Sequence, residues 1–126
     1  MCHGKYKQSL VTECDIKTFN ELLNINVRST MHILSLSVPF LKITKGNCTI
    51  LSSMERFILV NYGCLNSMIK SMINSLIQYS AFELASFVIR INGVAPGITN
   101  NNHRVNENFT ESDNKNVWKI FLNCSY

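Results

Sequence analysis

The chain has 126 residues, of which 46% are hydrophobic and 16% are charged, and its formal net charge is +4. This length predicts one small domain. The charged fraction lies below the roughly 25% usual for soluble domains, so the chain buries much apolar surface or leaves some uncovered for a partner. Its basic residues are scattered without runs, which argues against nucleic-acid binding. The longest apolar stretch, around residues 31–41, is interrupted by polar residues and is too short to span a membrane.

The five cysteines and three histidines exclude further classes of protein. No two cysteines form a CxxC pair and their number is odd, so neither a disulfide framework nor a zinc site is supported. The histidines have no partners at ligand spacing, and we predict no metal site. Reduced thiols indicate a cytoplasmic protein.

The first predicted element is a long amphipathic helix over residues 15–41, where apolar residues recur at the spacing of one helical face. Thr12 and Asp15 have the spacing of a capping box, in which both side chains hydrogen-bond to free amides of the first turn. Pro39 is expected to break this helix near its end, because proline lacks the amide N–H.

A strand, a helix and a second strand are predicted next, over residues 46–53, 63–87 and 88–94. Two strands joined by a helix form a parallel pair. The sequence therefore predicts an α/β fold, a partial Rossmann-like layer of parallel strands flanked by long helices. Ligands collect at the carboxyl ends of such strands, which here carry Ser52, Ser53 and the loop 92–99. The alternative is an irregular helical bundle in which the strands are misassigned.

The rest of the chain, residues 100–126, is polar at first, and we expect a loop there with at most a short helix over 111–121. No repeat and no linker divides the sequence. We therefore predict a single partial domain over residues 1–126.

Several polar residues lie at intervals that resemble those of a known protein family. Ser53 ends the first strand and lies thirteen positions before Asn66. Asn66 and Lys70 are four apart, on one face of the second helix. Asn26 lies within the first helix, and a Pro-Gly turn at 96–97 follows the second strand. In order and spacing these residues resemble the short-chain dehydrogenase/reductase family over residues 4–99.

The resemblance implies a protein that binds NAD or NADP and moves a hydride between the nicotinamide and a carbonyl or alcohol. It assigns Asn26 to holding a relay water and Ser53 to orienting the substrate carbonyl. It assigns Lys70 to binding the ribose and lowering the pKa of a catalytic tyrosine.

The turn after the second strand is also part of the resemblance. Pro96, Gly97 and Thr99 correspond to the loop at the nicotinamide, and with Lys70 they form the expected cofactor-binding set. In the family, helices corresponding to 15–41 and 63–87 commonly build a dimer interface.

The sequence departs from the family pattern in three places. Asn66 occupies the tyrosine position, and an amide cannot release and regain a proton near neutral pH. The chain begins where the family's Asn-Asn-Ala-Gly strand should end, with only Gly4 agreeing, so we expect the Gly-rich turn that cradles the pyrophosphate to be missing. The family's last strand is also missing, and Thr99 follows Gly97 sooner than usual.

A second register places Tyr62 at the tyrosine position and Asn66 at the lysine position, but it shortens the distance from Ser53. The first register keeps the spacings without gaps and is preferred. In a continuous helix, Tyr62 would lie about 12 Å from Lys70 along the axis, too far for direct assistance.

Three functional hypotheses follow. The first is an NAD(P)-dependent oxidoreductase by descent, truncated at both ends and inactive or impaired, in which cofactor binding is doubtful. The second is a non-catalytic partner that pairs through helices 15–41 and 63–87 with itself or with a complete family member. The third is a fragment without an independent role.

Overall fold

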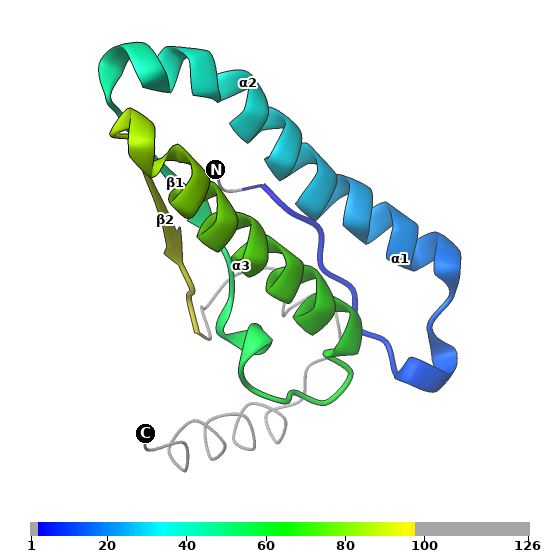
Figure 1. The fold of residues 1–126 in the computed structure, drawn as a ribbon. Coiled ribbons are helices and arrows are strands. Elements are labelled where there is room, and N and C mark those ends of the chain that lie inside the picture. Colours follow the sequence, from blue (N-terminus) through cyan, green and yellow to red (C-terminus); the bar gives the residue numbers. More distant parts are fainter. Residues whose placement is uncertain (1–2, 98–126) are drawn as a thin grey trace.

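The computed structural model describes residues 3–97 and shows a short parallel sheet flanked by two long helical segments (Figure 1). Strands β1 (Asn47–Leu51) and β2 (Arg90–Val94) pair in parallel, with Asn47 opposite Arg90 and Leu51 opposite Val94. Helix α3 (Cys64–Leu84) connects them and ends in the 3-10 turn η4 (Ala85–Phe87). The α/β prediction is confirmed, and the helical-bundle alternative is wrong.

The first helical segment is one continuous run composed of three elements. Helix α1 (Ile16–Leu22) passes into the π-helical stretch η2 (Leu23–Arg28) and then into α2 (Ser29–Thr44). A long helix over 15–41 was predicted, but its interruption by a π-helix was not. Such stretches insert an extra residue into a helical turn and often occur at functional sites.

The predicted end of this helix is wrong, because Pro39 lies inside α2, which continues to Thr44. The missing N–H of Pro39 leaves the carbonyl of Ser35 without its usual helical partner. Both residues are exposed, so water can hydrogen-bond to that carbonyl. The helix ends one turn later, where Lys45 adopts a left-handed conformation with φ of 49°.

The predicted capping box is only partly correct, because the Asp15 carboxylate binds a free amide of the first turn as expected but Asp15, not Thr12, is the N-cap of α1. Its carboxylate accepts hydrogen bonds from the Thr18 backbone N–H at 2.8 Å and from the Thr18 hydroxyl at 2.6 Å. Thr12 lies in a separate 3-10 turn, η1 (Val11–Glu13). The cap therefore lies three residues further along the chain than predicted.

The core lies between the sheet and the helices. Helix α3 contributes an apolar stripe at four-residue spacing, which places its members on one face of the helix. The strands, the residue just before β2 and the first helical segment supply the remaining buried side chains. The buried cluster consists of Leu22, Leu34, Ile50, Leu65, Ile69, Ile73, Ile77, Ile89 and Ile91.

The opposite face of α3 is exposed, although it also carries large apolar side chains such as Met68, Met72 and Phe82. None of the helices that the structure describes is long and apolar enough to cross a bilayer. The expected loop and short helix in 100–126 lie outside the described residues.

Candidate functional site

The carboxyl ends of β1 and β2 meet, as the sequence predicted. The backbone N–H of Ser52 donates to Val94 O at 2.7 Å, and that of Met54 donates to Pro96 O at 3.0 Å. The buried Ser52 hydroxyl also donates to the Lys70 carbonyl at 3.4 Å, which ties this end of the sheet to α3. Ser53 lies next to it, half-buried. Its Oγ accepts a hydrogen bond from the Glu55 N–H at 3.2 Å and so caps the 3-10 turn η3 (Met54–Arg56).

Lys70 is half-buried on α3 beside this turn. Burial lowers the pKa of its ammonium group, because the charged form loses hydration, and the Glu55 carboxylate partly opposes this shift. The Ser67 hydroxyl donates to the Glu55 carbonyl at 2.9 Å and holds η3 against α3. The structure thus places Ser53 and Lys70 at the same end of the sheet. The roles that the resemblance assigns to them stay predictions.

Asn66 lies one turn before Lys70 and is only 4% exposed. Its carboxamide pairs with both backbone groups of Lys7. Nδ2 donates to Lys7 O at 3.0 Å, and Oδ1 accepts from Lys7 N–H at 3.4 Å. Both polar atoms of the Asn66 side chain, at the position that the resemblance assigns to a tyrosine, therefore hydrogen-bond to the N-terminal segment.

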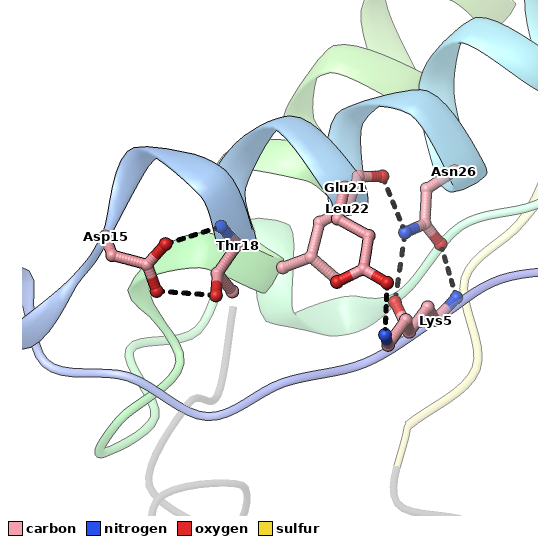
Figure 2. A network of polar contacts seen from close by, with 6 residues as sticks. All are labelled: Lys5, Asp15, Thr18, Glu21, Leu22 and Asn26. Carbon is pink, nitrogen blue, oxygen red and sulfur yellow. Dashed lines mark hydrogen bonds and ion pairs between the residues drawn. The ribbon is translucent and has the colours of Figure 1, made fainter.

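Asn26 lies in the π-helical stretch η2 and is 2% exposed. Its Nδ2 donates to Lys5 O at 3.0 Å and to Leu22 O at 2.9 Å, and its Oδ1 accepts from Lys5 N–H at 3.1 Å (Figure 2). The Asn26 carbonyl accepts a hydrogen bond from the Thr30 hydroxyl at 2.6 Å. The role predicted for Asn26, to hold a relay water, stays a prediction.

The remaining predicted cofactor residues follow β2. Pro96 is held by its hydrogen bond to Met54, Gly97 comes directly after it, and Thr99 lies outside the described residues. Tyr62 precedes α3 with a φ of 60° and is about half exposed. Because α3 begins at Cys64, Tyr62 is not part of a continuous helix, and the axial distance expected for that case does not apply to it.

Sequence reasoning missed two features of this site. The first is Glu55, whose signal is a charged side chain two residues after Ser53. The second is the segment of Lys5 and Lys7, which contacts the two asparagines through its main chain. A main-chain contact does not depend on residue type, so the pattern of residue types does not reveal it. Within residues 3–97 no three His, Cys, Asp or Glu side chains gather as metal ligands would.

These elements define a class of protein by its fold, the α/β proteins with a Rossmann-like parallel sheet. The family model described as enoyl-(acyl carrier protein) reductase matches residues 2–123. The chain belongs to the short-chain dehydrogenase/reductase family.

Among curated proteins, the chain is 35% identical over 86 residues to cis-2,3-dihydrobiphenyl-2,3-diol dehydrogenase of Pseudomonas putida. This match covers 68% of the chain and 31% of the dehydrogenase. It is also 34% identical over 82 residues to 1,2-dihydroxy-1,2-dihydronaphthalene dehydrogenase of a Ralstonia species, covering 65% of the chain and 31% of that protein. The chain thus spans about a third of the length of these relatives.

Solved structures show the same fold. ElxO with NADP bound superposes with a TM-score of 0.74 at 25% identity, covering 94% of this chain and 45% of ElxO. A short-chain alcohol dehydrogenase-like protein from Sinorhizobium meliloti has a TM-score of 0.79 at 16% identity and covers 90% of this chain and 45% of its own. The second likeness concerns the fold alone.

Residues 3–97 contain only part of the surroundings that the resemblance expects around NAD(P). The resemblance expects the nicotinamide and its ribose beside Lys70, which is half-buried, and beside the joined strand ends, and this expectation stays a prediction. A pyrophosphate is cradled by a Gly-rich turn that opens a helix directly after a strand. In residues 3–97, β1 leads into the Ser53-capped turn η3, and β2 leads into Pro96 and Gly97. Neither junction supplies that cradle, so the described residues do not fit the complete cofactor.

Proposed function

We propose that this chain is a short-chain dehydrogenase/reductase that does not by itself catalyse hydride transfer. The observation that carries the proposal is the buried Asn66 carboxamide, paired with both backbone groups of Lys7. A carboxamide has no proton to give or take near neutral pH. Proton transfer by a positioned group contributes about 10²- to 10⁴-fold in rate. The loss of that group alone would leave little activity, and the incomplete cofactor fit adds to it.

The names of the relatives suggest which ligands to test. Dihydrodiols of aromatic hydrocarbons are the substrate class in two of them, and NADP is the cofactor bound in ElxO. The purified chain should bind NADH and NADPH weakly in a fluorescence titration and should not oxidise a cis-dihydrodiol of biphenyl. Micromolar cofactor affinity or measurable turnover would contradict the proposal.

The variant Asn66→Tyr sharpens this test, because it restores the phenol without restoring a pyrophosphate cradle. We expect it to show no turnover with either cofactor. Asn74→Tyr, two turns further along α3, is the matched control for inserting a tyrosine into this helix. Turnover by Asn66→Tyr but not by Asn74→Tyr would show that the tyrosine was the only missing component.

A second candidate is a non-catalytic interaction partner that pairs through the helices of residues 15–41 and 63–87 with itself or with a complete family member. It is favoured by the large apolar side chains that α2 and α3 leave exposed, since such patches mark interaction surfaces. These side chains are Met31, Leu36, Phe40 and Ile43 on α2, and Met68, Met72, Tyr79 and Phe82 on α3.

Sedimentation at micromolar concentration tests this candidate. The chain should form a dimer that Met72→Lys disrupts, whereas Ser71→Lys, at the neighbouring exposed position, should leave it intact. A folded monomer, or a dimer that Met72→Lys does not change, would count against pairing through α3.

We further propose that residues 1–126 act as one domain in the cytoplasm. The free thiols of Cys14, Cys48 and Cys64 support a reducing compartment. Cell fractionation followed by detection of the chain tests the location, and recovery in a secreted fraction would contradict it.

A further inference from the structure

The N-terminal segment of residues 5–9, here called the strap, runs beside η2 and the start of α3 (Figure 1). Three alternate residues anchor it. Lys5 pairs with Asn26, Lys7 pairs with Asn66, and the Ser9 N–H donates to Tyr62 O at 2.9 Å. In an extended chain the main-chain groups of alternate residues face the same side. The strap is therefore hydrogen-bonded like an edge strand of a sheet, but its partners are mainly side-chain amides instead of a neighbouring backbone.

The two asparagines act in the same way. Each carboxamide donates to the carbonyl and accepts from the N–H of a single strap residue, which is the two-bond pattern of a hydrogen-bonded pair in a sheet. Lys5 and Lys7 are two residues apart, so the two anchoring points lie within about 7 Å of each other along an extended chain. Asn26 and Asn66, forty residues apart in sequence, therefore hold neighbouring points of one segment.

Gly4 provides an independent observation of this close fit. A Cβ atom at Gly4 would lie 2.6 Å from Asn26 Oδ1, a distance that real Cβ atoms essentially never show. The strap thus reaches the Asn26 amide so closely that a larger residue at position 4 would force the strap or the Asn26 side chain to shift. Asparagine is also unfavourable inside helices unless its polar group finds a partner, and the strap is that partner for both residues.

We propose that Asn26 and Asn66 form a two-amide clamp that holds the strap against η2 and α3. Asn66 is accordingly a positioning residue for the strap, at the point where the family resemblance places a catalytic tyrosine. While the clamp is closed, the side chain at position 66 is not available to a substrate. This inference goes beyond the proposed function, because the clamp operates whether or not the chain turns over a substrate.

Amide hydrogen exchange measured by NMR on the purified 126-residue chain tests the clamp directly. Asn66→Leu keeps a similar volume but removes both bonds to Lys7. We expect exchange of the Lys7 amide to accelerate about tenfold or more, since the opening of a local segment sets this rate. Asn74→Leu, the same change on the same helix, should leave the Lys7 amide protected. Trypsin cleavage after Lys7 should rise in Asn66→Leu alone.

A second pair of variants tests the strap without touching α3, in case Asn66→Leu does not fold. Lys7→Pro removes the N–H that donates a hydrogen bond to the Asn66 carboxamide. Gln8→Pro changes the next residue, whose N–H faces the other side of an extended chain. Lys7→Pro should accelerate exchange of the Lys5 and Ser9 amides, and Gln8→Pro should do so less. Unchanged exchange of the Lys7 amide in a folded Asn66→Leu, or equal effects of the two proline variants, would overturn the clamp.

Discussion

The side chain of Asn26 makes three hydrogen bonds, and replacing it with leucine measures what the buried amide contributes to stability. Leucine is close in volume, so the variant removes the bonds to both backbone groups of Lys5 and to Leu22 O without opening a large cavity. Asn26 is 2% exposed, so water cannot replace the amide while the strap stays in place.

The magnitude follows from the bonds lost. Each net hydrogen bond contributes about 0.5–1.5 kcal/mol, so three contribute about 1.5–4.5 kcal/mol. When the strap detaches, water satisfies the two groups of Lys5, which are only partly buried. We therefore expect Asn26→Leu to lower the free energy of unfolding by about 1.5–3 kcal/mol, toward the lower end of that range.

Urea unfolding followed by far-UV circular dichroism measures this loss. Asn24→Leu is the control, because Asn24 lies in the same π-helical stretch but is exposed and only accepts a 3.5 Å hydrogen bond from Arg28. Its effect should stay within about 0.5 kcal/mol, as for most surface changes. A loss in Asn26→Leu that is no larger than in Asn24→Leu would refute the reasoning.

Two further predictions concern the core and the site. Ile73→Ala should lower the free energy of unfolding by about 2–5 kcal/mol, because Ile73 is buried in the central cluster and the variant leaves a cavity. Ser75→Ala, at an exposed position of α3, should change the free energy of unfolding little. Equal losses for the two variants in urea unfolding would contradict this packing. Burial lowers the pKa of the Lys70 ammonium group below 10.5, so the folded state binds the ammonium proton less tightly than the unfolded chain does. The resulting loss of stability is fully present at pH values below the folded-state pKa. The difference in unfolding free energy between the wild type and Lys70→Met should therefore shift in favour of the wild type as the pH rises toward 10.5, and a constant or opposite difference would contradict the burial of Lys70.

Much of the fold could be predicted from the sequence because hydrophobic spacing reports directly on buried faces. The stripe of α3 at residues 65, 69, 73 and 77 has the four-residue spacing that predicts a helix, and the order of strand, helix and strand predicts a parallel pair. The helix ends were less predictable. Thr12 and Asp15 are both good N-caps. Pro39 lies on an exposed side of α2, where water can satisfy the freed carbonyl, and the sequence does not state this exposure.

The site, like the fold, could be predicted only in part from the sequence. Ser53 was expected at the carboxyl end of the first strand because it closes that strand, whereas Lys70 was assigned through the family resemblance. The hydrogen bond from Ser52 to the Lys70 carbonyl ties α3 to this end of the sheet. The contact between Asn66 and Lys7 could not be predicted from the sequence. Lys7 lies 59 residues away and contributes only its backbone, so nothing about its residue type indicates the contact.

The clamp also explains why position 66 holds an asparagine. If the site had merely lost its tyrosine, a position that is 4% exposed would favour an apolar side chain, because an unpaired buried amide costs about 1–3 kcal/mol. The two bonds to Lys7 remove that penalty and satisfy the strap as well. A leucine or phenylalanine at this position would leave both backbone groups of Lys7 without their partner. The same carboxamide that cannot transfer a proton is therefore suited to holding a backbone, so the proposed loss of activity and the contact with the strap would arise from one residue.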